Sequence, residues 1–178
     1  MPERTININF SVGRVEQKGD GCGIASAAMM VNYLNRKNYN FDEMFDINGS
    51  GDYETQWPTI ANKQNLKFKM ILSGTTNSTF NALKKELFDI LYFSPETPVI
   101  VRVANLSTDR KHYVVVNGFS GKVQTGVDPD NINYGSITAE MFRVVDPGII
   151  NNHTLEDVMD SYGGYPNADL RRLYFFYK

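Results

Sequence analysis

The chain of 178 residues contains a single cysteine, Cys22, and only two histidines, His112 and His153. One cysteine excludes an internal disulfide framework and any zinc site built on several thiolates. The two histidines are far apart and the acidic residues show no ligand spacing, so we expect neither a metal ion nor a cofactor. Any thiol chemistry must therefore use Cys22.

Long hydrophobic runs and an excess of one charge are also missing. No apolar run approaches the roughly 20 residues of a membrane-spanning helix, and the charged start, Met1–Thr5, lacks the apolar core of a secretory signal. A net charge of −2 gives no support to nucleic-acid binding. We expect a cytoplasmic protein, or one exported without a Sec signal; a chain trimmed of its signal peptide would look the same. The oligomeric state is left open.

What the chain does contain is a cysteine between two glycines, directly in front of an apolar run. Gly21 and Gly23 flank Cys22, and residues 24–34 are apolar on all sides of a helix, which predicts a centrally buried helix. A thiol in the first turn faces unpaired N–H groups and the positive end of the helix dipole, which favour its thiolate form. This arrangement suits nucleophilic catalysis.

Periodicity and turn residues predict the other elements. Strands are expected at residues 5–12, 67–72, 99–103, 112–119, 122–127, 141–145 and 170–177, and helices from about residues 23, 55, 78 and 154. Residues 39–53 are expected to be a loop, and its part 48–52, like the segment 120–140, is a candidate lid or partner surface. Helices followed mainly by antiparallel strands indicate an α+β fold, and we expect a single domain over 1–178.

A cysteine nucleophile needs a base and a group that orients the base. His112 opens an apolar strand after a polar loop and is the candidate base, whereas His153 precedes a helix cap and is expected at the surface. Two Asp–Pro pairs follow His112. A tight hairpin at residues 120–121 would bring Asp128 opposite residue 113, while Asp146 ends a more apolar strand and needs an excursion before it. Either aspartate could instead belong to an ordinary Asp–Pro turn.

The oxyanion of a tetrahedral intermediate needs hydrogen-bond donors. Gln17 lies five positions before Cys22, so its side-chain amide could swing over the thiol and act together with the Cys22 backbone N–H. Gly21 and Gly23 leave room for a substrate backbone to approach the sulfur.

These segments together resemble the papain-like cysteine peptidases, and among them the bacterial C39-like group. The resemblance runs from about residue 15 to the end and is carried by Gln17, Asp20–Met30, His112–Phe119 and Val145–Gly148. It implies a papain-like fold in which an N-terminal helical part, with the Cys22 helix at its centre, packs on a C-terminal antiparallel sheet. It also implies a nucleophile at Cys22, a base and acid at His112, an orienting aspartate, for which we favour Asp146 over Asp128, and an oxyanion donor at Gln17.

The expected function is cleavage of a peptide bond through an acyl-enzyme on Cys22, with a peptide or protein as substrate. The family's preference for small residues suggests, for example, a leader peptide that ends in glycines. The same residues would also serve an acyltransferase, a transglutaminase-like enzyme or a deamidase, which differ only in the group that attacks the thioester. A non-catalytic peptide-binding or effector module on this scaffold is the alternative from another class.

Overall fold

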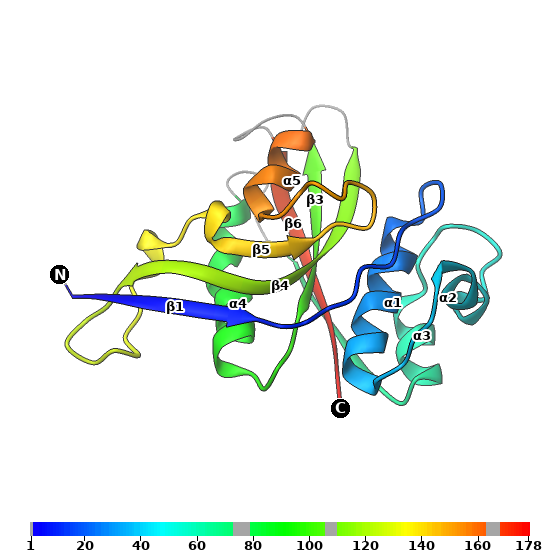
Figure 1. The fold of residues 1–178 in the computed structure, drawn as a ribbon, viewed down its shortest axis with the longest axis horizontal. Coiled ribbons are helices and arrows are strands. Elements are labelled where there is room, and N and C mark those ends of the chain that lie inside the picture. The colour runs from blue at the N-terminus through cyan, green and yellow to red at the C-terminus, as the bar shows by residue number, and fades with distance from the viewer. Residues whose placement is uncertain (1, 73–78, 106–109, 163–167) are drawn as a thin grey trace.

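The computed structural model describes residues 2–72, 79–105, 110–162 and 168–178 (Figure 1). Within these residues, six strands form one antiparallel sheet in the order β1-β4-β3-β6-β2, and β5 also pairs with β4. The strands are β1 (Glu3–Asn9), β2 (Lys67–Leu72), β3 (Val99–Asn105), β4 (Lys111–Gln124), β5 (Phe142–Val145) and β6 (Ala168–Tyr177).

Helices cover both faces of this sheet. The α-helices are α1 (Cys22–Asn35), α2 (Phe41–Asn48), α3 (Trp57–Lys63), α4 (Thr79–Phe93) and α5 (Leu155–Ser161), and two short 3₁₀-helices span Tyr134–Ser136 and Ala139–Met141. Figure 1 shows α1, α2 and α3 grouped at one end of the molecule, apart from α4 and α5. None of the helices in the described part of the chain combines the length and apolarity that crossing a membrane requires.

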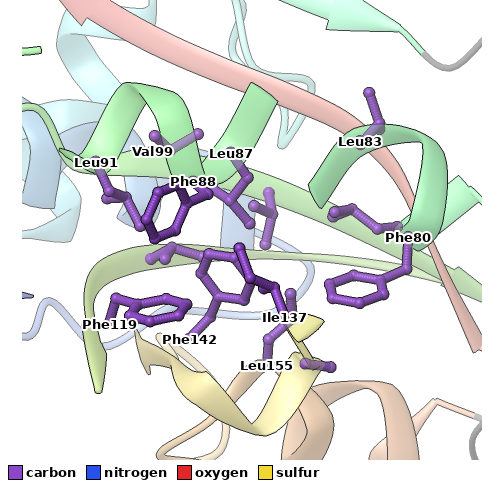
Figure 2. Packing of buried hydrophobic residues seen from close by; sticks show 14 of the residues in the cluster. Phe80, Leu83, Leu87, Phe88, Leu91, Val99, Phe119, Ile137, Phe142 and Leu155 are labelled. Carbon is purple, nitrogen blue, oxygen red and sulfur yellow. The ribbon is translucent and has the colours of Figure 1, made fainter. Parts of the chain in front are cut away.

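Two hydrophobic cores lie on opposite sides of the sheet. Alternate residues of β3 face them: Val99, Val101 and Val103 join the core under α4, whereas Ile100 joins the core under α1. Burial on both faces explains why this strand is apolar without alternation. Figure 2 shows the first core. In it, the apolar stripe of α4 that the sequence predicts packs against Phe119 of β4 and Phe142 of β5.

The second core encloses the cysteine-bearing helix. Every residue from Cys22 to Val31 is buried, as the apolar character of all its sides predicts. The helix ends at Asn35, where Arg36 adopts a left-handed conformation and its N–H bonds the Asn32 carbonyl. Helix α1 is thus fixed along its length, and its first residue has a defined position.

The prediction of a loop over residues 39–53 is wrong, because α2 begins at Phe41. The Asn40 side chain accepts a hydrogen bond from the Glu43 N–H at 2.9 Å, and the Glu43 carboxylate accepts from the Asn40 N–H at 3.1 Å. This reciprocal pair is a capping box, and Phe41 and Met44 bury the apolar face behind it. Residues 48–52 are not a free lid either, since the Asn48 side chain bonds both Glu54 and Gln56.

The tight hairpin at residues 120–121, the alternative that would have served Asp128, does not form, and the prediction of a separate strand at Lys122–Val127 is wrong. β4 continues through this point to Gln124, and Ser120 and Gly121 pair with Asn7 and Ile6 of β1. A partner strand from the start of the chain stabilises the extended conformation where local sequence suggested a turn. The following segment packs Ile132 and Ile137 into the core under α4 and contributes no residue to the cleft beside Cys22.

The remaining predicted elements are present with small shifts in their ends. The helix expected from Thr55 begins at Trp57 with Gln56 as its N-cap, and the Thr154–Asp157 capping box of α5 forms as predicted. Residues 74–77, whose glycine and polar residues predict a turn, lie outside the part of the chain that the structure describes.

Candidate active site

Two loops bring the first turn of α1 to the sheet. The Arg14 guanidinium donates to the carbonyl oxygens of Asp146 and Pro147, at 2.8 and 3.1 Å. The Gln17 N–H donates to the same Pro147 carbonyl at 2.9 Å. The loop that leads into Cys22 is therefore tied to the loop that follows β5, although the two are far apart in sequence.

His112, the second residue of β4, is buried against Asp146. Its Nε2 lies 2.7 Å from Asp146 Oδ1, and the two side chains are 3% and 0% exposed. Burial opposes the charged imidazolium, but hydrogen bonds and attraction from Asp146 and Cys22 outweigh it and raise the pKa of His112 to about 9. Because Asp146 occupies Nε2, Nδ1 is the ring nitrogen left for Cys22.

The Asp146 carboxylate is held by its own loop as well as by His112. Oδ1 accepts hydrogen bonds from the N–H groups of Gly148 and Ile149, at 2.8 and 2.9 Å, and Oδ2 accepts from Asn152 Nδ2 at 3.0 Å. Burial opposes ionisation, but these donors and His112 hold the pKa of Asp146 below its usual value. The acceptor that faces His112 is therefore a fixed anion.

An aromatic ring covers one face of the imidazole. The Tyr162 ring stacks on His112 with centroids 5.0 Å apart and planes at 9°, and the Arg110 guanidinium lies 5.2 Å from the Tyr162 ring centre. The stack limits rotation of the His112 ring and keeps water from that face.

Of the alternatives left open by the sequence, Asp128 and His153 lie elsewhere. Asp128 is exposed and its Oδ1 accepts from the Asp130 N–H at 3.0 Å, which is the ordinary Asp–Pro turn. His153 is exposed, and its backbone N–H donates to Asp157 at the start of α5. The structure thus brings Cys22, His112 and Asp146 together.

Gln17 lines the same cleft, and its side-chain amide forms a hydrogen bond within its own loop. Its Nε2 donates to the Gly19 carbonyl at 2.8 Å, and its Oε1 is buried without a hydrogen-bond partner among the described residues. A Cβ on Gly148 would lie 2.7 Å from Gln17 Oε1 and 3.3 Å from His112 Cε1, so Gln17 stands beside the histidine. The Gln17 amide has two N–H groups and uses one of them on Gly19, so the other remains as a donor.

Cys22 and His112 open on a cleft of about 640 Å³ with an aromatic wall. Trp57 stacks on Tyr174 with centroids 4.7 Å apart and meets the Tyr113 ring edge at 5.4 Å. A side chain on Gly23 would clash with Thr55, so the close packing of the first turn of α1 on Thr55 depends on a glycine there. The described residues contain no group of three or more His, Cys, Asp or Glu that could hold a metal ion.

A family model matches most of the chain, including the segments that carry these residues. The chain matches the Peptidase_C39 like family over residues 9–146. It belongs to this family. Membership supports a peptidase-type function in general, while no curated protein matches the chain.

A solved structure has the same fold as this C39-like chain. It is a double glycine motif protease from an AMS/PCAT transporter, determined in complex with the leader peptide. The identity is 19%, the TM-score is 0.54, and the match covers 94% of this chain and 92% of that chain. The likeness confirms the α+β, papain-like architecture expected from the sequence.

Three residues of this C39-like site were not found from the sequence. Asn152 and Arg14 hold the Asp146 loop, and Tyr162 stacks on His112. Nothing local distinguishes Asn152 from its neighbour Asn151, or Arg14 from other loop cations. Their roles arise only from contacts between segments distant in the chain.

Proposed function

We propose that this C39-like chain is a cysteine peptidase with Cys22 as nucleophile. The observation that carries the proposal is the buried His112, held through Nε2 by the Asp146 carboxylate and interacting with Cys22 on its other side. A buried imidazole between a carboxylate and the chain's single thiol is the arrangement that activates a cysteine.

In this mechanism His112 and Cys22 react as an imidazolium–thiolate pair. The Cys22 sulfur attacks the carbonyl carbon of the peptide bond, and its electron pair moves to the carbonyl oxygen. As the tetrahedral intermediate collapses, the C–N bond breaks and the His112 Nδ1 proton passes to the leaving amine. His112 then takes a proton from water, which attacks the thioester and releases the acid product and free Cys22.

The oxyanion is stabilised at the start of α1. The Cys22 N–H belongs to the first helical turn, whose N–H groups have no acceptor within the helix. Gln17 supplies a second donor through the N–H of its side-chain amide that is not bonded to Gly19. Asp146 keeps the His112 ring oriented throughout.

The substrate in this proposal is a peptide, which binds in the cleft beside Cys22 along its aromatic wall. Since a protease of the same fold was determined with a leader peptide, peptides with a glycine pair before the cleaved bond are the first to test.

The single cysteine makes the test specific. Labelling of Cys22 by iodoacetamide at pH 6 should be fast in the wild type and at least about 100-fold slower in His112→Ala. Mass spectrometry measures the labelled fraction. The matched control is His153→Ala, the other histidine, which should label at the wild-type rate. Peptide cleavage should be lost in Cys22→Ala.

Slow labelling that is equal in wild type and His112→Ala would contradict an activated thiol and leave a non-catalytic peptide-binding module. Fast labelling without hydrolysis, but with product formation in the presence of an added amine, would assign acyl transfer instead.

A further inference from the structure

Two arginines stand directly opposite each other on the sheet next to Cys22. Arg102 of β3 pairs in register with Arg172 of β6, and the same row continues to Tyr113 of β4 and Leu72 of β2. Direct partners in antiparallel strands project their side chains from the same face.

This row lies on the face of the sheet that α1 covers, just beyond the helix. The core under α1 contains Ile100, Val115 and Tyr174, each of which lies two positions from a member of this row in its own strand. Tyr113 and Arg172 themselves line the cleft that contains Cys22, and Arg102 lies between them in the sheet. Arg172 therefore lines the cleft beside the proposed nucleophile, and Arg102 lies next to it in the sheet.

The positive charge of this pair is not balanced within the described residues. Neither guanidinium forms an ion pair there, and Arg102 Nε is buried without an acceptor. Among the described residues, the Arg172 guanidinium makes only a long bond of 3.4 Å, to the Tyr174 hydroxyl. Like charges directly opposite on a sheet repel each other, so the fold gains nothing from placing them together.

Neighbouring groups do not supply the missing anion. Burial and a hydrogen bond to Tyr174 raise the pKa of Tyr113, so its hydroxyl stays neutral. Lys111 adds positive charge to the cleft, while Asp20 and Glu54 line it without an ion pair to either arginine in the described part of the chain. The sheet side of the cleft is thus cationic.

We propose that Arg102 and Arg172 form a subsite that binds a carboxylate of the peptide substrate close to the bond attacked by Cys22. The inference rests on the proposed peptidase function and names its substrate class, acidic peptides. A guanidinium binds a carboxylate through two parallel N–H···O bonds, and the Trp57, Tyr113 and Tyr174 wall packs the methylene groups of the acidic side chain.

The test compares matched peptides that carry Glu or Gln at successive positions on both sides of a glycine pair, with acetylated and amidated ends. At one position, kcat/KM for the Glu peptide should exceed that for the Gln peptide by about tenfold, the effect of one charge-assisted hydrogen bond. Arg172→Gln should remove the preference, and Arg172→Glu should favour Lys there. The control is Arg143→Gln, an exposed arginine of β5 outside the cleft lining, which should keep the preference.

Further peptides have Gln at every tested position and either a free or an amidated C-terminus. They distinguish binding of a side-chain carboxylate from binding of the terminal carboxylate. A preference that follows Glu assigns a side-chain carboxylate, and one that follows the free end assigns a terminal carboxylate; both support the subsite. Cleavage that is Cys22-dependent but indifferent to every carboxylate would overturn it while leaving the peptidase intact.

Binding to Cys22→Ala keeps the two proposals separable, because Trp57 is the single tryptophan and lines the cleft. If the acidic peptides shift Trp57 fluorescence at about tenfold lower concentration than the Gln peptides, but wild type cleaves none, the subsite stands and the peptidase proposal fails. Equal binding of both peptides to correctly folded protein, without cleavage, would overturn both.

Discussion

At the scale of single residues, His112 and Asp146 are each held from more than one side. His112 contacts Asp146, Cys22 and the Tyr162 ring, and Asp146 is bonded by two backbone N–H groups and Asn152 as well as by His112. Precision in proton transfer depends on such supporting contacts, since each limits the rotation of a catalytic side chain.

Replacing Asp146 by Asn should lower the pKa of His112, because the hydrogen bond and charge that raise it are removed or weakened while burial continues to oppose the imidazolium. We expect the pH above which kcat/KM for peptide cleavage declines, because His112 has lost the proton that it gives to the leaving amine, to move down from about 9 by at least one unit. The peptidase rate at pH 7 should fall by about 100-fold or more. The measurement is a pH–rate profile of peptide cleavage for the wild type and for Asp146→Asn.

The matched control is Asp128→Asn, which changes the other aspartate that precedes a proline. Its profile should coincide with that of the wild type, since Asp128 caps an exposed turn. A shift in Asp128→Asn and none in Asp146→Asn would contradict the assignment of the orienting carboxylate.

At the scale of elements, β4 connects the site to the rest of the sheet. Its first residues pair with β3 and carry His112, and its last residues pair with β1. Gly118 lies where β1 and β5 both pair with β4, and a Cβ there would collide with the Ile8 carbonyl. A backbone group cannot move aside as a flexible side chain can, so this crossing of strands requires glycine.

Gly118→Ala should therefore separate β1 from β4 and lower the free energy of unfolding by about 2 kcal/mol, within the range for overpacked sites. Urea unfolding followed by circular dichroism measures the loss. The control is Gly13→Ala, because nothing lies within 4 Å of a Cβ at that position. Equal stability of both variants would show that β1 does not need this close approach.

At the scale of the whole molecule, the buried His112–Asp146 pair couples stability to pH. His112 has an ordinary pKa of 6.5 and a pKa of about 9 in the folded chain. A raised pKa means that the imidazolium stabilises the fold fully below about pH 6.5 and that this contribution is lost as pH rises through 9. For Asp146, whose pKa is lowered, the contribution is instead lost in acid.

We expect the free energy of unfolding to fall by roughly 3 kcal/mol between pH 6.5 and pH 10, from the difference between these two pKa values. Urea midpoints across this range measure it. The fall should be much smaller in His112→Gln. In Cys22→Ser it should be smaller and should end at a lower pH, because only Asp146 then supports the imidazolium. A pH-independent wild type would contradict the buried charged pair.

Much of the fold could be predicted from local patterns. Three patterns each lie within one element and formed as expected: the apolar character of α1 on all its sides, the apolar stripe of α4 and the Thr154–Asp157 capping box. The missed helix α2 also had a local signal, the Asn40–Glu43 spacing, which the polar loop-like composition around it obscured.

The sequence by itself determined which residue carries the thiol, that this residue begins a buried helix, and that His112 begins a buried strand, because hydrophobic periodicity and helix-end chemistry act over a few residues. Only the tertiary structure decided that Asp146 rather than Asp128 meets His112, that Tyr162 covers the ring and that Arg102 faces Arg172. Each of these depends on strand pairing or on loops from distant parts of the chain. β4 extends through residues 120–121 because β1 supplies its hydrogen-bonding partners there, and no local preference encodes that partner.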